Sequence, residues 1–247
     1  MTGSADGVTT VEFFGVPGAG KSTIARRLTE RLAATGRPVA EPTYELAHEV
    51  SSVRRYLSKS GYAAVGTLRQ PRRALVGARA IADSGQPSGR ALVKTTFNWQ
   101  YVTGVLELRA PGELQVLDQG LVQAAWSVGL GAERDRTPSL CELAVDALSR
   151  GGTALVVVVD VAPETVRERL SRRADGDTRV SPTGDGHGVS EALERKERVE
   201  RSLVDAVADE PSVDLLHVDN ESRADLEDAV ATVFERLEGE RHGVSGR

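Results

Sequence analysis

The chain has 247 residues, of which 40% are hydrophobic and 27% charged, and its formal net charge is −5. This composition is typical of a soluble globular protein with a sizeable core, excludes disorder of the whole chain, and argues against a nucleic-acid polymer as ligand. Because no apolar run approaches the roughly 20 residues that span a bilayer and Cys141 has no second cysteine to pair with, we expect a cytoplasmic protein without a disulfide or a cysteine-based metal site.

The first strong signal is a short β-prone run, Thr10–Gly15, that ends in glycine. The segment Gly15–Ser22 follows at once and fills the pattern G-x-x-x-x-G-K-[ST]. A helix is predicted over Thr23–Ala34, because apolar residues recur there at helical spacing. Strand, loop and helix thus come in the order that a phosphate-binding loop requires, which favours this interpretation over a chance glycine-rich turn.

Each position of this loop has a chemical reason. Glycines allow backbone N–H groups to converge on the β-phosphate of a nucleotide, and the helix N-terminus adds a favourable dipole. Lys21 would bring a mobile positive charge to the β- and γ-phosphate oxygens, and the hydroxyl of Ser22 is placed to ligate Mg²⁺. The predicted nucleotide-binding residues are Gly15, Pro17, Gly18, Ala19, Gly20, Lys21, Ser22 and Thr23.

A second strand is predicted within Arg37–Thr43, ending at Glu41-Pro42 because proline cannot donate to a strand ladder. Glu41 would then lie at the carboxyl end of a parallel strand, which is the edge where ligands bind in open α/β sheets. From there its carboxylate could face the phosphate loop across a cleft. The alternative interpretation is a solvent-exposed carboxylate in a turn, since most glutamates are exposed.

The loop at Gly15–Thr23, followed by a strand that ends in Glu41-Pro42, resembles the P-loop nucleoside and nucleotide kinases, the group that contains thymidylate kinases and deoxynucleoside kinases. The resemblance implies a doubly wound α/β fold with a five-stranded parallel sheet over residues 1–240, and a reaction that uses ATP and Mg²⁺. It also implies that Glu41 is the general base on the acceptor hydroxyl. The chemistry agrees, because a carboxylate near the γ-phosphate can orient and deprotonate an attacking hydroxyl.

The segment 44–110 is mostly helical in pattern, with breaks near Ser60-Gly61, Gln70-Pro71 and residues 84–89. Residues 50–82 contain no Asp or Glu but seven basic residues, namely Arg54, Arg55, Lys59, Arg69, Arg72, Arg73 and Arg79. This cluster could clamp a phosphate or another anion of the acceptor, because arginine binds phosphate bidentately. A solvated helix face explains it as well, since long charged side chains lie on surfaces at little cost.

In the kinases that the chain resembles, an insertion after the second strand builds the acceptor site, so residues 44–110 are expected to do so here. Tyr44, Trp99 and Gln100 are its candidate substrate-binding residues. A ring that stacks on a base and an amide that reads it would suit Trp99 and Gln100. Core packing is the alternative, because aromatic residues are more often structural.

Two apolar strands end in an aspartate, one over Leu114–Gly120 at Asp118 and one over Ala154–Asp160. The chain order in the resembled kinases assigns Asp118 to the Mg²⁺ shell and makes Asp160 mainly structural, which agrees with the preference of Mg²⁺ for carboxylate oxygens. The chain departs from these kinases at Gln119, where they usually carry arginine. Gln119 could hydrogen-bond the acceptor, whose identity this departure leaves open.

An arginine-rich helical stretch follows the second of these strands and resembles the lid of the same kinases, which we place at residues 167–190. Lid arginines would fold over the nucleotide, neutralise the charge that develops during phosphoryl transfer and help to exclude water. Arg169 and Arg173 share a helix face and are the catalytic candidates, while Arg172 and Arg179 are candidates for nucleotide binding. A solvated helix is the alternative.

The C-terminal part completes the predicted sheet. A helix is predicted over Glu191–Asp209, the last strand over Val213–Val218 and a closing helix over Ser222–Leu237. Residues 241–247 are predicted to be a disordered tail. The four histidines are scattered without the spacing of metal ligands, so the sequence does not support a zinc site.

Together these features predict a Mg-ATP-dependent phosphotransferase that acts on a small-molecule acceptor, which the resemblance makes a nucleoside or nucleotide. Two alternatives stay open. One is a kinase of a sugar, an antibiotic or another specialised metabolite on the same scaffold, and the other is a nucleotide-driven switch protein without acceptor chemistry. Neither a nucleic-acid polymer nor a membrane is expected as a partner. The choice between ATP and GTP, an anionic acceptor and a homodimer are left open.

Overall fold

The computed structural model describes residues 8–48, 52–172, 180 and 188–244. Its five strands form one sheet in which every neighbouring pair is parallel. Across the sheet the order is β2 Val39–Ala40, β3 Leu114–Leu117, β1 Thr10–Phe14, β4 Ala154–Asp160 and β5 Val213–Asp219.

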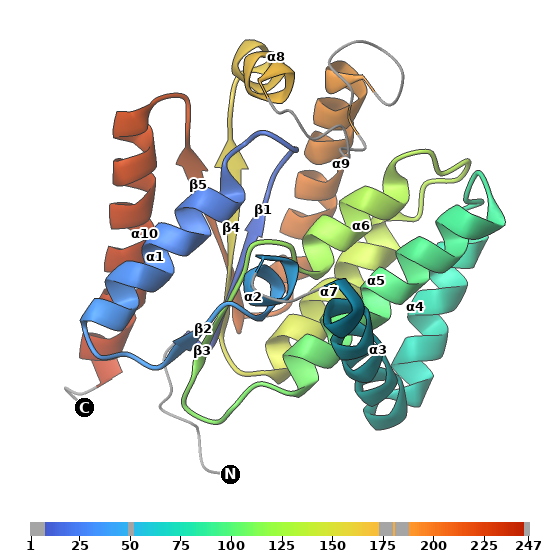
Figure 1. Ribbon diagram of the computed structural model, residues 1–247, viewed down its shortest axis with the longest axis horizontal. Helices are drawn as coiled ribbons and strands as arrows, with labels where there is room; N and C mark the ends of the chain where they lie inside the picture. The colour runs from blue at the N-terminus through green and yellow to red at the C-terminus, as the bar shows by residue number, and fades with distance from the viewer. Residues whose placement is uncertain (1–7, 49–51, 173–179, 181–187, 245–247) are drawn as a thin grey trace.

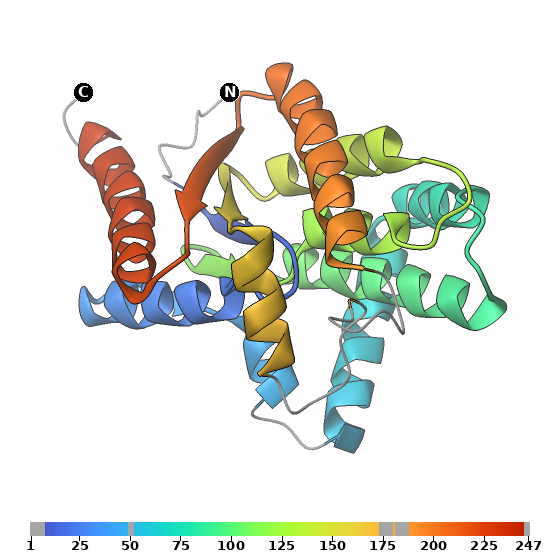
Figure 2. The same ribbon diagram turned by 90° about the horizontal axis from the view of Figure 1, so that it is seen from above.

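Helices cover both faces of this sheet, as Figures 1 and 2 show. On one face lie α1 Lys21–Ala34 and α10 Arg223–Val244; on the other lie α6 Leu121–Gly129, α7 Thr137–Arg150 and α9 Val189–Ala208. Beyond α6 are α5 Gly89–Glu107, α4 Pro71–Asp83 and α3 Ser52–Arg69. The short helices α2 Pro42–His48 and α8 Pro163–Ser171 directly follow β2 and β4. The predicted doubly wound, five-stranded parallel sheet is therefore confirmed.

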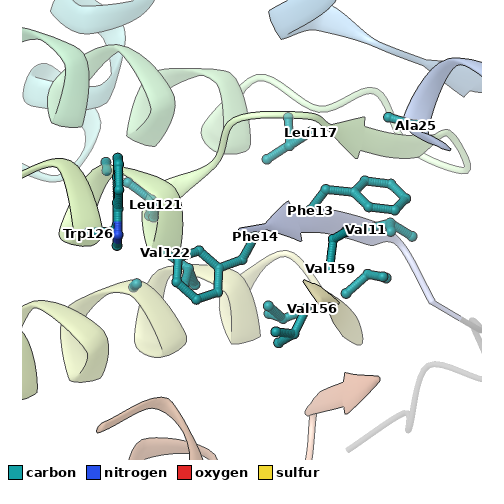
Figure 3. Packing of buried hydrophobic residues seen from close by; sticks show 14 of the residues in the cluster. Val11, Phe13, Phe14, Ala25, Leu117, Leu121, Val122, Trp126, Val156 and Val159 are labelled. Atoms are coloured by element: carbon teal, nitrogen blue, oxygen red, sulfur yellow. The ribbon is translucent and has the colours of Figure 1, made fainter. Parts of the chain in front are cut away.

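The central strands are apolar on both sides because helices cover both faces of the sheet. Every residue of β1 is buried, and so are the first six residues of β4. Phe13 and Phe14 point to opposite faces: Figure 3 shows Phe14 beside Val122 of α6, and Phe13 on the side where Ala25 of α1 lies. This packing holds the carboxyl edge of the sheet, from which the glycine-rich loop leaves β1.

The helical insertion differs from its prediction at one point. α3 continues through Ser60-Gly61, so the break predicted there is wrong, whereas helices do end at Gln70-Pro71 and at residues 84–89. α3 and α5 approach so closely that a Cβ on Gly66 would lie 2.7 Å from the backbone nitrogen of Gly104. Packing along the whole of α3 therefore outweighs the weak helix propensity of glycine.

The ends of the predicted elements also shift. The helices α6 and α7 have no counterpart among the predicted elements, and α10 extends beyond the predicted Leu237 to Val244. The predicted disordered tail is thus wrong for residues 241–244, while 245–247 lie outside the described residues. No proline follows Leu237 to end the helix, and Glu238 pairs with Arg37 at 3.7 Å.

Among the residues described, no helix has the length and apolarity needed to cross a membrane.

One carboxylate lies inside the sheet. Glu12 of β1 is 0% exposed and accepts hydrogen bonds from the backbone N–H groups of Leu121 at 3.0 Å, Val122 at 2.7 Å and Gln123 at 3.1 Å. These are the first residues of α6, whose N–H groups have no partner within the helix. Burial raises the pKa of Glu12 to about 7, although the three N–H bonds oppose the rise. Glu12 therefore anchors the N-terminus of α6 beneath the loop.

We expect this carboxyl to make stability depend on pH. Between pH 4.5, the ordinary pKa of a glutamate, and about 7, the folded protein keeps a proton that the unfolded chain has released, so stability falls as the pH rises. Glu12→Gln removes this titration and keeps an amide oxygen as acceptor for α6. Melting temperatures measured across this window should therefore fall less steeply in E12Q than in the wild type. The exposed Glu235→Gln is the control, and an E12Q profile parallel to it would contradict the expectation.

Candidate functional site

The loop between β1 and α1 carries glycine where no other residue fits. Gly18 and Gly20 have φ angles of +90° and +92°, a region that L side chains rarely adopt. A Cβ on Gly15 would lie 2.9 Å from the carbonyl oxygen of Val159, and one on Gly20 would overlap the side-chain amide of Asn220. The predicted order of strand, glycine loop and helix is confirmed, and the loop lies tightly against the carboxyl edge of the sheet.

The first turn of α1 brings an ammonium group to this loop. Lys21 is 9% exposed, and its Nζ donates to the carbonyl oxygens of Gly15 at 2.7 Å and Val16 at 3.1 Å. Pro17 is half-buried in the loop and Thr23 is exposed in the first turn of α1. Backbone N–H groups at a helix N-terminus, together with this ammonium, form an environment suited to an anion.

Asp118 reaches the same helix from the end of the neighbouring strand β3. Its Oδ2 accepts a hydrogen bond from the Ser22 hydroxyl at 2.7 Å, and its Oδ1 accepts one from the Thr43 hydroxyl at 2.8 Å. Asp118 is 5% exposed and pairs with no cation among the described residues. Thr43 was not predicted, and its only signal is its position two residues after Glu41.

Glu41 directly follows β2 and is 2% exposed, so the alternative of an exposed turn carboxylate is wrong. Its Oε2 accepts from Nη1 of Arg26 at 3.3 Å, while Oε1 is buried and makes no hydrogen bond of ordinary geometry among the described residues. Burial raises the pKa of Glu41, the hydrogen bond and charge of Arg26 lower it, the negative charge of Asp118 raises it, and the nearby Thr29 hydroxyl lowers it. A half-satisfied carboxylate thus lies near the Ser22–Asp118 pair.

Arg26 links Glu41 to the aromatic candidate of α2. Its guanidinium lies 5.3 Å from the ring centroid of Tyr44, in addition to its ion pair with Glu41. Arg26 was not predicted, although it lies four residues after Ser22 and so on the same face of α1. The structure therefore places Tyr44 beside the buried carboxylate.

The glutamines after β3 have different positions. The predicted candidate Gln119 is exposed, whereas Gln123 of α6 is 9% exposed and its Oε1 accepts from the backbone N–H of Gly15 at 3.3 Å. Gln123 was not predicted, because nothing in the local sequence distinguishes it. It ties the start of the loop to α6, whose N-terminus Glu12 anchors.

Trp99 and Gln100 lie within the helical insertion. A Cβ on Gly77 of α4 would lie 2.7 Å from the indole nitrogen of Trp99, and Nε2 of Gln100 donates to the carbonyl oxygen of Ala74 at 2.9 Å. Both side chains are buried between α4 and α5, which agrees with the core-packing interpretation. Their neighbour Tyr101 is buried as well, and the negative charge of Asp118 contributes to the rise of its pKa.

Arg169 of α8 is the lid candidate that contacts the loop. Its Nη1 donates to the carbonyl oxygens of Gly18 at 3.3 Å and Ala19 at 3.5 Å, and its Nη2 donates to those of Asn220 at 2.7 Å and Glu221 at 3.2 Å. A guanidinium thus bridges the glycine loop and the segment after β5. This position suits a cation that acts on a bound nucleotide.

The other lid candidates lie elsewhere. Arg172 is exposed and pairs with Glu168 at 2.5 Å. Arg173 and Arg179 lie outside the described residues, as do residues 181–187 of the predicted lid. Only Arg169 of the four candidates is therefore seen at the loop within the part of the chain that the structure describes.

Asn220 completes the contacts around the loop. It is 4% exposed at the end of β5, and its Nδ2 donates to the carbonyl oxygen of Ala19 at 2.5 Å. It was not predicted, although a polar residue directly after a parallel strand lies at the ligand-binding edge of the sheet. The position of the Asn220 amide therefore requires glycine at position 20, because any Cβ there would overlap it.

Asp160, at the end of β4, has partners of its own. Nζ of Lys196 donates to its Oδ1 at 2.5 Å and also bonds Glu200, and Nδ1 of His217 lies 2.9 Å from its Oδ2. The oxygens and nitrogen of Asp160, Glu200 and His217 come within 4.8 Å of one another, but the ammonium of Lys196 already joins the two carboxylates. The structure thus supports a structural role for Asp160.

The described residues thus place a glycine-rich loop between β1 and α1, in a parallel sheet of order β2-β3-β1-β4-β5. No family model and no curated protein matches the sequence. Among solved structures, a gluconokinase from Sinorhizobium meliloti 1021 is 15% identical, with 96% of this chain and 93% of that chain covered and a TM-score of 0.41. A thymidylate kinase from Candida albicans is 13% identical, with 96% and 94% covered and a TM-score of 0.46. At such scores these likenesses carry no argument about function, which rests on the site itself.

The fit of Asn220 against Gly20 predicts a difference between two glycine substitutions. Gly36 has a φ of +79° and nothing within 4 Å of its Cβ position, so Gly36→Ala should cost only the strain of a left-handed residue, about 1 kcal/mol. Gly20→Ala adds the displacement of Asn220 and of the loop. We expect G20A to be less stable than G36A in urea, and to bind Mg·ADP at least about tenfold more weakly by calorimetry. Equal affinities would contradict this reading of the loop.

Proposed function

We propose that the protein is a Mg²⁺- and ATP-dependent phosphotransferase that moves the γ-phosphoryl group to a hydroxyl of a small molecule. The observation that carries this proposal is the buried carboxylate of Glu41, whose Oε1 makes no hydrogen bond of ordinary geometry among the described residues and which lies near the Ser22–Asp118 pair. A protein that only binds nucleotide has no need of such a group. Buried polar atoms without a partner are rare, and each calls for a ligand or another explanation.

The donor would bind at the loop. Backbone N–H groups and the N-terminus of α1 hold its phosphates, and Lys21 turns from the carbonyl oxygens of Gly15 and Val16 to the β- and γ-phosphate oxygens. Arg169 adds a second positive charge from α8. These groups supply charge where the transition state gains it, which is how phosphoryl transfer is mainly catalysed.

Ser22 and Asp118 fit a magnesium ion. Both offer hard oxygen atoms, and a carboxylate that is 5% exposed without a cationic partner among the described residues has a charge to be balanced. Thr43, bonded to the other carboxylate oxygen, would keep Asp118 turned toward Ser22. Held by Ser22 and Asp118, Mg²⁺ would supply positive charge to offset that of the nucleotide phosphates.

Glu41 would act as the general base. The acceptor hydroxyl gives its proton to Oε1 of Glu41, its oxygen forms a bond to the γ-phosphorus, and the bond from that phosphorus to the β–γ bridging oxygen breaks to release ADP. Arg26 holds the other oxygen of the same carboxylate at 3.3 Å and so fixes its direction. The raised pKa of Glu41 suits a group that must take up a proton.

The acceptor is less narrowly defined. The resemblance in the sequence favours a nucleoside or nucleotide. A non-nucleotide metabolite is supported by two observations: Gln119 is exposed, and Trp99 and Gln100 are engaged between helices rather than free to read a base. The nucleotide-driven switch is favoured by no observation that the kinase does not also explain.

We expect Glu41→Gln to slow acceptor-stimulated ADP formation by about a hundredfold or more, because general bases contribute factors of that size. The assay supplies Mg·ATP with pools of nucleosides, nucleoside monophosphates, sugars and amino-alcohols. Lys21→Ala serves as the blank. Glu235→Gln, an exposed glutamate of α10, is the control and should stay within about threefold of the wild type.

The pH dependence gives a second check on Glu41. Because the base must be ionised and its pKa is raised, the wild-type rate should increase with pH through that raised value and then level off. E41Q should lose this rise. A mutant rate close to that of the wild type, or an unchanged pH profile, would refute the assigned base.

A further inference from the structure

One lysine of the helical insertion lies against an aromatic ring. Lys59 of α3 is half-buried, forms no ion pair with a carboxylate among the described residues, and has its ammonium 4.8 Å from the ring centroid of Tyr101. Burial lowers the pKa of Lys59, as does the charge of Arg55 one turn earlier, whereas the charge of Asp118 raises it. An ammonium in such a place is stabilised by an anion that binds beside it.

Tyr101 of α5 presents a second unsatisfied group at the same place. It is 3% exposed, its hydroxyl makes no hydrogen bond to any residue that the structure describes, and its ring packs edge-on against Tyr62 with centroids 6.0 Å apart. A phenol hydroxyl buried without a partner costs stability that phenylalanine would not cost. The arrangement suits a group that donates to a ligand.

Both groups lie close enough to Asp118 for its negative charge to act on them. The negative charge of Asp118 acts to raise the pKa of Lys59, that of Tyr101 and that of Glu41. Lys59 and Tyr101 come from α3 and α5, which pack side by side next to α2 (Figure 1). The predicted insertion thus brings one cation and one hydroxyl donor together, within the range of the charge of Asp118.

Of the other six members of the basic cluster, Arg55 is half-buried one turn before Lys59, and the remaining five are exposed or bonded within the protein. Arg54 and Arg72 are exposed. Arg69 donates to the carbonyl oxygen of Glu107 at 2.6 Å, Arg73 pairs with Asp146, and Arg79 pairs with Asp83 at 3.7 Å. The solvated-face interpretation therefore describes most of the cluster, and Lys59 is its inward member without a carboxylate partner.

We propose that Lys59 and Tyr101 form a subsite for a fixed negative charge on the acceptor, so that the acceptor is a hydroxyl compound bearing a phosphate or a carboxylate. This inference rests on the proposed phosphotransferase for its second substrate. An oxyanion would accept a hydrogen bond from the ammonium and another from the phenol hydroxyl. A neutral acceptor would leave both donors buried and unpaired, so the subsite discriminates against it.

The test measures anion binding without turnover. Protein saturated with Mg·ADP is titrated with inorganic phosphate or with acetate at constant ionic strength, and the rise in melting temperature gives the dissociation constant. We expect stabilisation of the wild type. Lys59→Met should weaken binding about tenfold or more, and Lys94→Met, an exposed lysine of α5, should leave it unchanged. Affinity for Mg·ADP shows that each variant is folded.

Tyr101→Phe separates a binding role from a structural one. It removes a buried hydroxyl that has no partner, so the anion-free protein should melt no lower than the wild type, while anion binding weakens about threefold or more. A lower melting temperature together with unchanged anion affinity would assign the hydroxyl to the fold and refute this part of the subsite.

The outcomes distinguish the two proposals. Stabilisation by phosphate alone identifies a phosphate-bearing acceptor, and stabilisation by acetate as well extends the subsite to carboxylates. If the anion stabilises K59M as strongly as the wild type, the subsite is overturned, because an ion in the γ-phosphate position would give that result. The absence of any stabilisation of the wild type overturns the subsite as well. ADP formation from Mg·ATP tests the phosphotransferase independently: Lys59-dependent anion binding without turnover would overturn that activity and keep the subsite.

Discussion

The close approach of the glycine loop to the carboxyl edge of the sheet is the constraint on which the rest of the structure depends. Gly15 lies against the backbone of Val159 and Gly20 against the amide of Asn220, at distances that leave no room for a Cβ. Because the loop is held there, the N-terminus of α1 points across the end of β1. Ser22 then meets Asp118 at the end of the neighbouring strand, at 2.7 Å. A loop displaced by a side chain would separate this pair.

The buried ionisable groups divide according to how they are satisfied. Glu12 accepts three hydrogen bonds from backbone N–H groups of α6, and Lys196 bonds both Asp160 and Glu200. Each of these groups therefore has its partners within the fold and helps to stabilise it. Asp118 and the half-buried Lys59 form no ion pair among the described residues, and Oε1 of Glu41 makes no hydrogen bond of ordinary geometry there. Since each unsatisfied buried group costs about 1–3 kcal/mol, their gathering near one strand edge points to a ligand that supplies what is missing.

Much of the fold could be predicted where the signal is contiguous. The glycine pattern of the loop and the apolar runs of β1, β3, β4 and β5 are local, and Glu41-Pro42 marks the end of β2 as expected. The failures have physical reasons as well. Gly61 does not interrupt α3, because α3 packs against α5 along its length, and α10 passes Leu237 because no residue there stops a helix.

The sequence by itself determined the phosphate loop and the strand ends that carry Glu41 and Asp118, because turn chemistry and the order of strands are written in consecutive residues. Only the tertiary structure decided which side chains meet them. Gln123 and Asn220 reach the glycine loop from segments far apart in the chain, and Lys59 of α3 meets Tyr101 of α5. Their positions depend on how closely helices pack on one another and on the sheet. No local pattern encodes that distance, because it results from the fit of many buried side chains at once.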